Sequence, residues 1–313
     1  MAVLVTGGAG FIGSHVSRLL ATAGKDVVVL DDFSTGRPEN LANVPCRIVR
    51  GSILDQEVLH SALVGIDEVV HLAALVSVPL SLENPSRTHE INATGTLRVL
   101  QASVRAGVRR FVQASTSAVY GAVVGAPSSE STPTCPASPY AATKLAAETY
   151  AQAYSVCYGL STVSLRFFNV YGPHQDTRSP YSGVLSLFLA RSLAGEELHV
   201  YGDGEQTRDF IAVQDVSRAV LLSLSDRSQT RVFNIGSGTS ISLNAVIDVI
   251  SGVLGRKCRV SYAAERRADI RHSCADIQLA HRQLGFTPSV ELRDGLLATI
   301  DWVQSGAPAE KLM

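Results

Sequence analysis

A doubly wound parallel α/β sheet, followed by a second and smaller α/β domain, is the fold that the sequence predicts. Apolar, β-branched runs alternate with helical stretches over the first half of the 313 residues, as is typical of parallel sheets with helices on both faces. This alternation ends after Pro173, where a polar stretch with Gly and Pro begins. We therefore expect a first domain over residues 1–173 and a second over residues 174–313, with residues 209–235 returning to the first.

Short runs rich in β-branched residues mark the strands, and helical spacing of apolar residues marks the helices. Ligands of open parallel sheets bind beyond the carboxyl ends of the strands. Residues that directly follow a strand are therefore the first candidates for a functional site. The expected strands are residues 3–5, 27–30, 47–49, 68–72, 111–114 and 161–166, and the expected helices are residues 15–23, 56–64, 94–106 and 184–194.

The composition argues against several classes of protein. A formal net charge of -1 gives no electrostatic reason to expect a nucleic acid or an anionic membrane as partner. The five cysteines form no CxxC pair and the eight histidines show no HxH or HxxxH spacing, so we expect reduced thiols and no metal site. No run of about 18 apolar residues occurs, so the sequence predicts a soluble cytoplasmic protein.

The turn after the first strand carries three glycines at the spacing GxxGxxG. Gly7, Gly10 and Gly13 follow the apolar residues 3–5 and lead into a helix. Glycines at these positions let backbone N–H groups approach a pyrophosphate, and a helix N-terminus favours negative charge. The pattern indicates a dinucleotide site, and the alternative is a tight turn without a ligand.

The second strand ends in Asp31, at the edge where a bound dinucleotide would lie. A carboxylate there can accept hydrogen bonds from both ribose hydroxyls of NAD, and it repels the 2′-phosphate of NADP. The sequence therefore predicts NAD as the cofactor.

A YxxxK pair opens a helix in the middle of the chain. Ser138 is the expected N-cap and Pro139 the first helical residue, which puts Tyr140 and Lys144 on one helix face. A cation beside a tyrosine lowers the pKa of its phenol, which is ordinarily about 10. We expect Lys144 and an oxidised nicotinamide to make Tyr140 a general base. The alternative is a pair on a helix surface.

These motifs, in this order, resemble the extended short-chain dehydrogenase/reductase family, and within it the NAD-dependent nucleotide-sugar epimerases and dehydratases. The resemblance runs from Val3 to about Trp302 and implies a Rossmann domain for NAD and a smaller domain for the nucleotide sugar. The matching segments are residues 31–32 (Asp-Asp), 51–55 (Gly-Ser-Ile-Leu-Asp), 71–74 (His-Leu-Ala-Ala), Asn92 with Thr96, 115–121 (Ser-Thr-Ser-Ala-Val-Tyr-Gly), 166–173 (Arg-Phe-Phe-Asn-Val-Tyr-Gly-Pro) and 201–210 (Tyr-Gly-Asp-Gly-Glu-Gln-Thr-Arg-Asp-Phe).

The resemblance also implies roles for individual residues. Thr116 contacts the sugar 4-hydroxyl, Tyr140 removes its proton, and Lys144 holds the nicotinamide ribose, with Ser117 beside them. Asp55 contacts adenine. Further NAD contacts are implied for Phe11, Ile12, Asp32, Ser34, Gly36, Ile53, Leu72, Ala73, Ala74 and Asn92. Substrate contacts are implied for Ser77, Asn169, Val184, Leu185, Tyr201, Arg208, Arg266, Asp269 and Ser273, with Arg208 and either Arg266 or Arg267 on the diphosphate.

The residues after Thr116 distinguish between the reactions of this family. Similar 4,6-dehydratases carry an Asp-Glu pair there, and similar decarboxylases carry a glutamate at the second position, whereas this chain has Ser117 and Ala118. The simplest outcome is that a 4-keto sugar turns in the pocket and receives hydride on its other face, which is 4-epimerisation. Dehydration of a UDP-sugar by 4,6- or 5,6-elimination is the alternative. A non-catalytic NAD-sensing relative is a more remote one.

The expected substrate is a UDP-hexose without a carboxylate. Asp176 stands where uronic-acid epimerases of this type carry an arginine. Ser273 matches a position where a tyrosine in some UDP-galactose epimerases excludes N-acetyl groups. This small side chain favours UDP-N-acetylglucosamine and UDP-N-acetylgalactosamine, and UDP-glucose and UDP-galactose are the second pair. The resemblance further implies a homodimer through the helices around residues 92–106 and 140–158.

Overall fold

The structure, a computed structural model, describes residues 1–122, 127–176, 183–225, 230–265 and 270–305. Its centre is a parallel sheet of seven strands in the order β11-β6-β5-β4-β1-β2-β3. The doubly wound parallel α/β sheet predicted from the sequence is confirmed. Its strands are β1 (Ala2–Thr6), β2 (Asp26–Asp31), β3 (Cys46–Arg50), β4 (Glu68–His71), β5 (Arg110–Thr116), β6 (Ser161–Phe167) and β11 (Thr230–Ile235).

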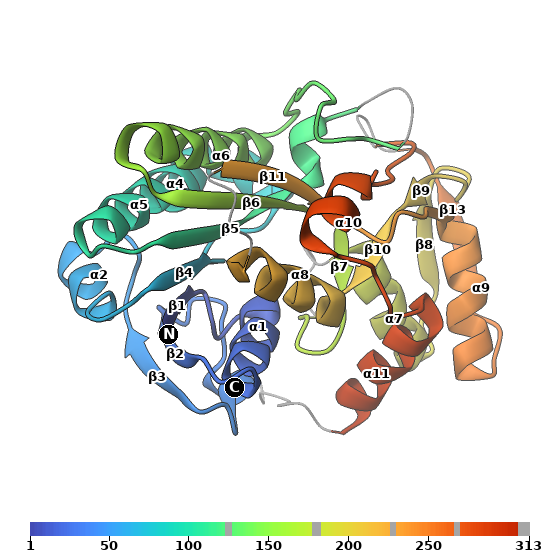
Figure 1. Ribbon diagram of the computed structural model, residues 1–313. Coiled ribbons are helices and arrows are strands. Elements are labelled where there is room, and N and C mark those ends of the chain that lie inside the picture. The colour runs from blue at the N-terminus through green and yellow to red at the C-terminus, as the bar shows by residue number, and fades with distance from the viewer. Residues whose placement is uncertain (123–126, 177–182, 226–229, 266–269, 306–313) are drawn as a thin grey trace.

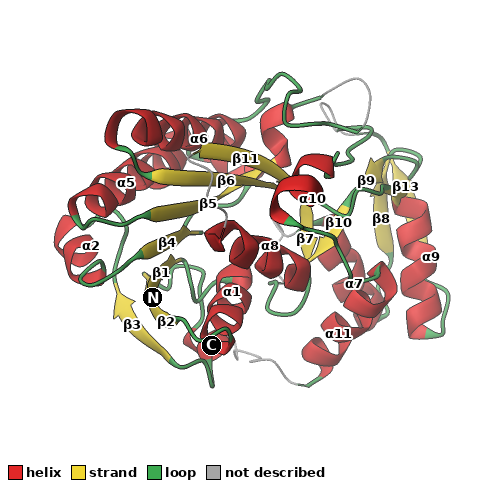
Figure 2. Ribbon diagram, in the orientation of Figure 1, coloured by secondary structure: helices red, strands yellow, loops and turns green. Residues whose placement is uncertain are grey.

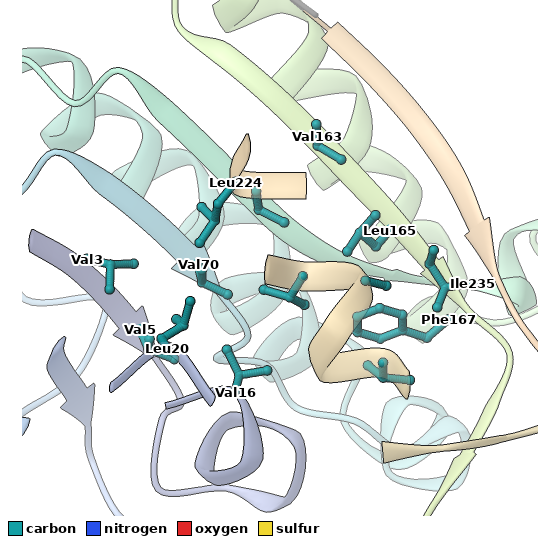
Figure 3. Close-up of a cluster of buried hydrophobic side chains, with 14 of the residues drawn as sticks. Val3, Val5, Val16, Leu20, Val70, Val163, Leu165, Phe167, Leu224 and Ile235 are labelled. Carbon is teal, nitrogen blue, oxygen red and sulfur yellow. The ribbon is translucent and has the colours of Figure 1, made fainter. Parts of the chain in front are cut away.

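Helices cover both faces of this sheet (Figures 1 and 2). The side chains of alternate strand residues point to opposite faces, so each face has its own hydrophobic cluster. On one face α1 (Phe11–Thr22), α8 (Val213–Ser225) and α10 (Gln278–Leu284) pack on the strands, and Figure 3 shows part of that cluster. On the other face the packing helices are α2 (Gln56–Ala62), α5 (Gly95–Arg105) and α6 (Pro139–Tyr158).

The segment between β4 and α5 leaves the carboxyl end of β4 and is largely helical. It consists of α3 (Val78–Glu83), α4 (Pro85–His89) and a π-helical turn, η2 (Glu90–Thr94). Single π-helical turns are rare and are often found at functional sites. The remaining short helices are the 3-10 turns η1 (Pro38–Leu41) and η3 (Ser117–Tyr120).

A smaller region with its own hydrophobic cluster lies beyond the carboxyl end of β6, and we call it the second region. Here α7 (Val184–Ala194), α9 (Leu243–Leu254) and α11 (Leu292–Gln304) surround three two-stranded sheets. The pairs are β7 (Asn169–Tyr171) with β10 (Phe210–Ala212), β9 (Thr207–Arg208) with β12 (Ile241–Ser242), and β8 (Leu198–Tyr201) with β13 (Val260–Ala263).

The chain returns from this second region to the main sheet at α8 and then β11, which pairs with β6 along its whole length, and again at α10. A return was predicted for residues 209–235, of which β10 pairs with β7 in the second region. The domain boundary at residue 173 stays a prediction.

The helix that carries the YxxxK pair begins where its capping residues predict. Ser138 accepts a hydrogen bond on its side chain from the backbone N–H of Ala141 (3.2 Å), and Pro139 is the first helical residue. In contrast, α1 begins at Phe11, four residues before the predicted start, because the glycine turn leads directly into the helix.

Candidate functional site

The glycine turn between β1 and α1 is too tight for side chains. Gly7 has φ of +69°, and a Cβ atom there would lie 2.8 Å from the backbone nitrogen of Ala73. A Cβ atom on Gly13 would collide with the Gly7 carbonyl oxygen. Gly10 donates its backbone N–H to that same oxygen (3.2 Å) and is the N-cap of α1. Phe11 and Ile12, both half-buried, form the first helical positions. The turn therefore exposes backbone at a helix N-terminus, as a pyrophosphate requires.

Asp31 is held in place at the end of β2. Its two carboxylate oxygens accept the backbone N–H groups of Ala9 and Phe33, each at 2.9 Å. Burial raises the pKa of this carboxyl, and the two N–H groups lower it. Gly36 passes so close that a Cβ atom would lie 2.7 Å from Asp31 Oδ1. Because each carboxylate oxygen has a second lone pair, Asp31 can still accept the two ribose hydroxyls predicted for it.

The neighbouring acidic residue Asp32 organises the next turn. Its Oδ1 accepts the backbone N–H of Ser34 (2.9 Å) and the hydroxyl of the same residue (2.6 Å). Asp32 and Ser34, both predicted to contact NAD, therefore lie in the turn directly after β2.

Asp55 and Ile53 follow β3. The Asp55 carboxylate caps α2 by accepting the backbone N–H groups of Glu57 (2.9 Å) and Val58 (3.2 Å). Ile53 is buried, and its side chain leaves no room for a Cβ atom on Gly95 at the start of α5. The predicted adenine contact at Asp55 would add to this capping role.

A hydrogen-bonded chain through His71 crosses the sheet below the site. The backbone N–H of Ala73 donates to the Thr6 hydroxyl (3.3 Å), which donates to His71 Nδ1 (2.7 Å). On its other side His71 Nε2 donates to the Thr96 hydroxyl (2.9 Å), which donates to the Asn92 carbonyl oxygen (2.6 Å). Because the Thr96 hydroxyl donates to Asn92, the proton of a neutral His71 imidazole lies on Nε2, and Nδ1 is then the acceptor of the Thr6 hydroxyl.

The neutral state of His71 agrees with its surroundings. Burial and the nearby Lys144 ammonium lower its pKa to about 3. Because Ala73 and Asn92 are at the two ends of the chain, His71 fixes two of the predicted NAD contacts. Sequence reasoning placed His71 in a family motif and gave it no role.

Asn92 joins the loop after β4 to α6. Its side chain accepts the backbone N–H of Leu75 (2.8 Å) and donates to the Leu75 carbonyl (3.1 Å) and the Thr143 hydroxyl (3.2 Å). Leu72 and Ala74 are half-buried in the same loop, where Ser77 is the N-cap of α3 and accepts the backbone N–H of Leu80 at 3.1 Å.

Tyr140, Lys144 and Thr116 meet where α6 crosses the carboxyl end of β5. Tyr140 and Lys144 are only 8% and 4% exposed, and the side chains of Tyr140 and Thr116 are hydrogen-bonded. The Thr116 hydroxyl also accepts the backbone N–H of Ala118 (3.2 Å). Ser117, the next residue after Thr116, is half-buried.

Burial dominates the protonation of the YxxxK pair. It raises the pKa of Tyr140 to about 12, against the hydrogen bond from Thr116, and it lowers the pKa of Lys144 to about 8, against the charge of Glu148. The sequence predicted a lowered tyrosine pKa, and in the protein alone the direction is the opposite. The reason is that desolvation of the phenolate outweighs the hydrogen bond from Thr116.

Lys144 has the chemistry that a ribose requires. Within the described residues the ammonium of this buried side chain makes no hydrogen bond or ion pair. Its nitrogen is not among the fully enclosed polar atoms without a partner, so its three donors are open to a ligand. The hydroxyls of a nicotinamide ribose would supply the missing acceptors, so these residues fit NAD.

The predicted substrate residues lie in the second region. Arg208 donates to the carbonyl oxygens of Thr207 (2.9 Å) and Ile270 (2.6 Å). Ser273 is half-buried and lies on the neighbouring segment, with its backbone N–H on the Thr207 carbonyl (3.2 Å). Arg208, on β9, and Ser273, on the adjoining segment, thus lie close together, and we call this part of the second region the sugar edge.

Four further substrate predictions fall on other elements around that edge. The Asn169 side chain donates to the Asp209 carbonyl (3.1 Å), and Tyr201, which ends β8, is 38% exposed. At the start of α7, Val184 is half-buried and Leu185 is buried in the hydrophobic cluster. The predicted contacts at Arg266, Asp269 and the alternative Arg267 lie outside the described residues.

A buried ion pair beneath the site escaped the sequence analysis. Arg166 donates to both carboxylate oxygens of Glu148, at 3.0 and 2.8 Å. Glu148 lies four residues after Lys144 and eight after Tyr140, so helical spacing could have placed it on the catalytic face.

Two further findings concern classes of protein. The described parts of the chain contain no cluster of three or more His, Cys, Asp or Glu side chains suited to a metal ion. Among the described helices, none has the length and apolarity to cross a membrane.

Comparison with known proteins identifies the family. The model of the NAD dependent epimerase/dehydratase family matches residues 3–236. The chain is 38% identical to UDP-glucose 4-epimerase of Thermotoga maritima, solved with UDP-glucose, with a TM-score of 0.94 over 98% of this chain and 100% of that one. It is 39% identical to UDP-N-acetylglucosamine 4-epimerase of Methanobrevibacter ruminantium, with a TM-score of 0.93 over 97% and 98%.

A dehydratase is also similar. The dTDP-glucose 4,6-dehydratase of Streptomyces venezuelae, solved with NAD bound, is 35% identical, with a TM-score of 0.89 over 97% of each chain. The chain belongs to the NAD-dependent epimerase/dehydratase family, and its cofactor is NAD.

Proposed function

We propose that this enzyme is a redox-neutral UDP-sugar 4-epimerase that interconverts UDP-N-acetylglucosamine and UDP-N-acetylgalactosamine. The observation that carries the proposal is the site around Thr116. It has a proton acceptor, Tyr140, and a cation, Lys144, while Ser117 and Ala118 stand where an elimination would need carboxyl groups.

The side chains divide the work of the reaction. Thr116 orients the sugar 4-hydroxyl toward Tyr140, whose phenolate removes the hydroxyl proton and later returns it to the 4-oxygen of the other epimer. The Lys144 ammonium lies one helical turn away and stabilises the phenolate. NAD, when bound, supplies reversible hydride transfer at C4. Since hydride leaves and returns to the same carbon, the overall reaction is neither an oxidation nor a reduction.

The burial of the site explains why the base needs its neighbours. A phenol with a pKa of about 12 is almost entirely protonated at neutral pH. The Lys144 ammonium and the positive charge of oxidised nicotinamide both favour the phenolate. Tyr140 therefore becomes a good base only in the complex, which limits proton transfer to the moment when cofactor and sugar are in place.

Elimination is disfavoured because the nearby carboxylate is already engaged. To remove the C5 proton and expel the C6 hydroxyl, an enzyme needs an acid and a base that reach the sugar. Glu148 is on the catalytic helix, but both of its oxygens accept hydrogen bonds from Arg166. The similar dehydratase keeps dehydration as the alternative for the experiment to decide.

Substrate choice is inferred from the second region. Ser273 leaves room for an acetamido group beside C2 of the sugar, and Arg208, with Arg266 or Arg267, would bind the diphosphate through planar guanidinium groups. The similarity to a UDP-N-acetylglucosamine 4-epimerase supports this choice. The similarity to a UDP-glucose 4-epimerase makes UDP-glucose the natural comparison substrate.

We also propose that the enzyme works as a homodimer. Tyr150, Val156 and Tyr158 are exposed on α6, on the helix that the family resemblance places at the dimer interface. Burying such side chains against a second copy would stabilise the pair.

The test is proton NMR of the nucleotide sugar after incubation with purified protein and no added cofactor. We expect UDP-N-acetylglucosamine to reach equilibrium with UDP-N-acetylgalactosamine, and Tyr140→Phe is the inactive control. A 4-keto-6-deoxy sugar or an alkene would establish dehydration instead. Accumulation of NADH in proportion to product would establish a net dehydrogenase.

A further inference from the structure

Glu148 occupies a special place under the catalytic face of α6. It lies one helical turn beyond Lys144, and its side chain is buried with 6% exposure. Its carboxylate accepts two hydrogen bonds from the Arg166 guanidinium, at 3.0 and 2.8 Å, and one from the hydroxyl of Ser115. Ser115 directly precedes the catalytic Thr116 on β5, so one carboxylate contacts both elements that carry the reacting groups.

The partner of Glu148 is itself held firmly. Arg166 stands opposite Ser115 in the register of β5 and β6. It donates to the Tyr120 hydroxyl (3.0 Å), which donates to Asn234 on β11 (2.6 Å), and its guanidinium lies 4.9 Å from the centre of the Tyr120 ring. A buried ion pair with this many partners has a fixed geometry. Glu148 is therefore a fixed negative charge on the helix that carries Lys144.

The charged and titratable groups around Lys144 come from three elements. On α6 itself they are Tyr140 and Glu148, on β4 the imidazole of His71, and behind Glu148 on β6 the guanidinium of Arg166. Tyr140 and His71 are neutral near pH 7, because their pKa values are about 12 and about 3. Glu148 is therefore the anion that acts on the Lys144 ammonium, and it opposes the effect of burial on the pKa of that group.

We propose that Glu148 is a positioning residue that keeps Lys144 protonated and fixes α6 against the Thr116 end of β5. The inference rests on the proposed function only for the role of Lys144, whose side chain must be a cation to bind the ribose and stabilise the phenolate. A purely structural Glu148 would stabilise the fold without changing the protonation of Lys144. These two roles give different results when the charge is removed without a change of shape.

The chain suits a direct titration, because it contains only four lysines: Lys25, Lys144, Lys257 and Lys311. Protein labelled with ¹³C at lysine Cε, with NAD bound and without sugar, would be titrated by NMR, and the Lys144 signal assigned by its loss in Lys144→Arg. In the protein alone burial lowers the pKa of Lys144 to about 8, and the wild type with NAD bound is the reference for the variants. In Glu148→Gln the pKa should fall by roughly one unit or more, as expected for the loss of a nearby opposite charge.

Two further variants serve as matched controls. Arg166→Gln leaves the Glu148 charge unpaired, so the pKa of Lys144 should rise. Ser115→Ala removes a hydrogen bond to the same carboxylate without removing a charge, so the pKa should stay at its wild-type value while turnover falls. The alkaline limb of the kcat profile should follow the Lys144 titration in each variant. An unchanged Lys144 pKa in folded Glu148→Gln overturns the proposal, even if turnover is reduced.

The double variant Glu148→Gln, Arg166→Gln keeps the test decisive if a single variant fails to fold. Breaking one partner of a buried pair is strongly destabilising, whereas removing both is much less so. Because Glu148 acts on Lys144 from the same helix, whereas Arg166 lies behind it on β6, the Lys144 pKa should still lie below the wild-type value. A wild-type pKa in the folded double variant contradicts the proposal. The titration needs no sugar, so its result is independent of whether the enzyme epimerises or dehydrates.

Discussion

The proposed catalytic face of α6 and the proposed sugar-binding edge around Arg208 are built in different ways. On α6, Tyr140, Lys144 and Glu148 are buried at intervals of four residues and are fixed by the strands beneath them. At the other edge, Arg208 donates to two backbone carbonyls and Ser273 is half-buried. In our proposal the chemistry is therefore fixed by the core of the fold, whereas the sugar is chosen by side chains that can change without disturbing that core.

The comparison predicts that substitutions on α6 act on turnover and substitutions at the sugar edge act on binding. Tyr140→Phe should have the largest effect, lowering kcat by roughly 10²–10⁴-fold, because it removes the proton acceptor. The matched control is Tyr150→Phe, an exposed tyrosine on the same helix. Bound NAD and KM should change little. A Tyr140→Phe enzyme with wild-type kcat would contradict the claim that α6 determines turnover and the sugar edge determines binding.

Arg208→Ala should act in the opposite way, by weakening the binding of UDP while NAD stays bound. Loss of a charged hydrogen bond costs roughly 1.5–3 kcal/mol, which is about tenfold or more in Kd. Calorimetry with UDP measures the change. Arg259→Ala is the control, because this exposed arginine of the same region donates to the carbonyl of Gly195 (2.6 Å). Equal UDP affinity in both variants and the wild type would show that Arg208 does not bind the diphosphate.

Ser273→Tyr should sharpen the comparison by changing which sugar is used. A tyrosine ring would occupy the space proposed for the acetamido group, and overpacking costs roughly 1–3 kcal/mol. We expect kcat/KM to fall far more for UDP-N-acetylglucosamine than for UDP-glucose, while Ser273→Ala keeps the wild-type ratio. If the ratio is also unchanged in Ser273→Tyr, the side chain does not face C2 of the sugar.

His71 should give the smallest effect, on the stability of the cofactor half. Its pKa is about 3 in the folded protein and 6.5 as an ordinary histidine, so the unfolded chain binds more protons below pH 6.5. Folding stability is therefore lost as the pH falls from 6.5 toward 3, by roughly 1 kcal/mol per pH unit. Urea unfolding at pH 6.5 and 5.5 measures this slope. The change in unfolding free energy per pH unit should be smaller in His71→Gln and equal to the wild type in His60→Gln, where the histidine is exposed.

Local signals were enough to predict most of the fold. The β-branched runs gave the strands of the parallel sheet, and Ser138 and Pro139 gave the start of α6, because strand pairing and capping depend on neighbouring residues. The π-helical turn that contains Asn92 was not predicted, since its geometry depends on the contacts of Asn92 with Leu75 and Thr143.

The sequence supplied the residues of the proposed site, whose roles stay predictions, but it did not predict their electrostatics. Spacing placed Tyr140 beside Lys144, but the raised pKa of Tyr140 comes from burial, which a motif does not express. The neutral state of His71 likewise depends on Thr6 and Thr96, which are distant in sequence. The ion pair of Glu148 with Arg166 was not predicted for the same reason, because its partners lie on different elements.

The most direct test of the central claim follows the hydride itself. UDP-N-acetylglucosamine with deuterium at C4 would be converted in ordinary water and the product analysed by NMR and mass spectrometry. Our account predicts that the deuterium stays at C4 of UDP-N-acetylgalactosamine and that no solvent hydrogen enters C5. Deuterium at C6, or loss of water with solvent hydrogen at C5, would contradict 4-epimerisation and establish elimination.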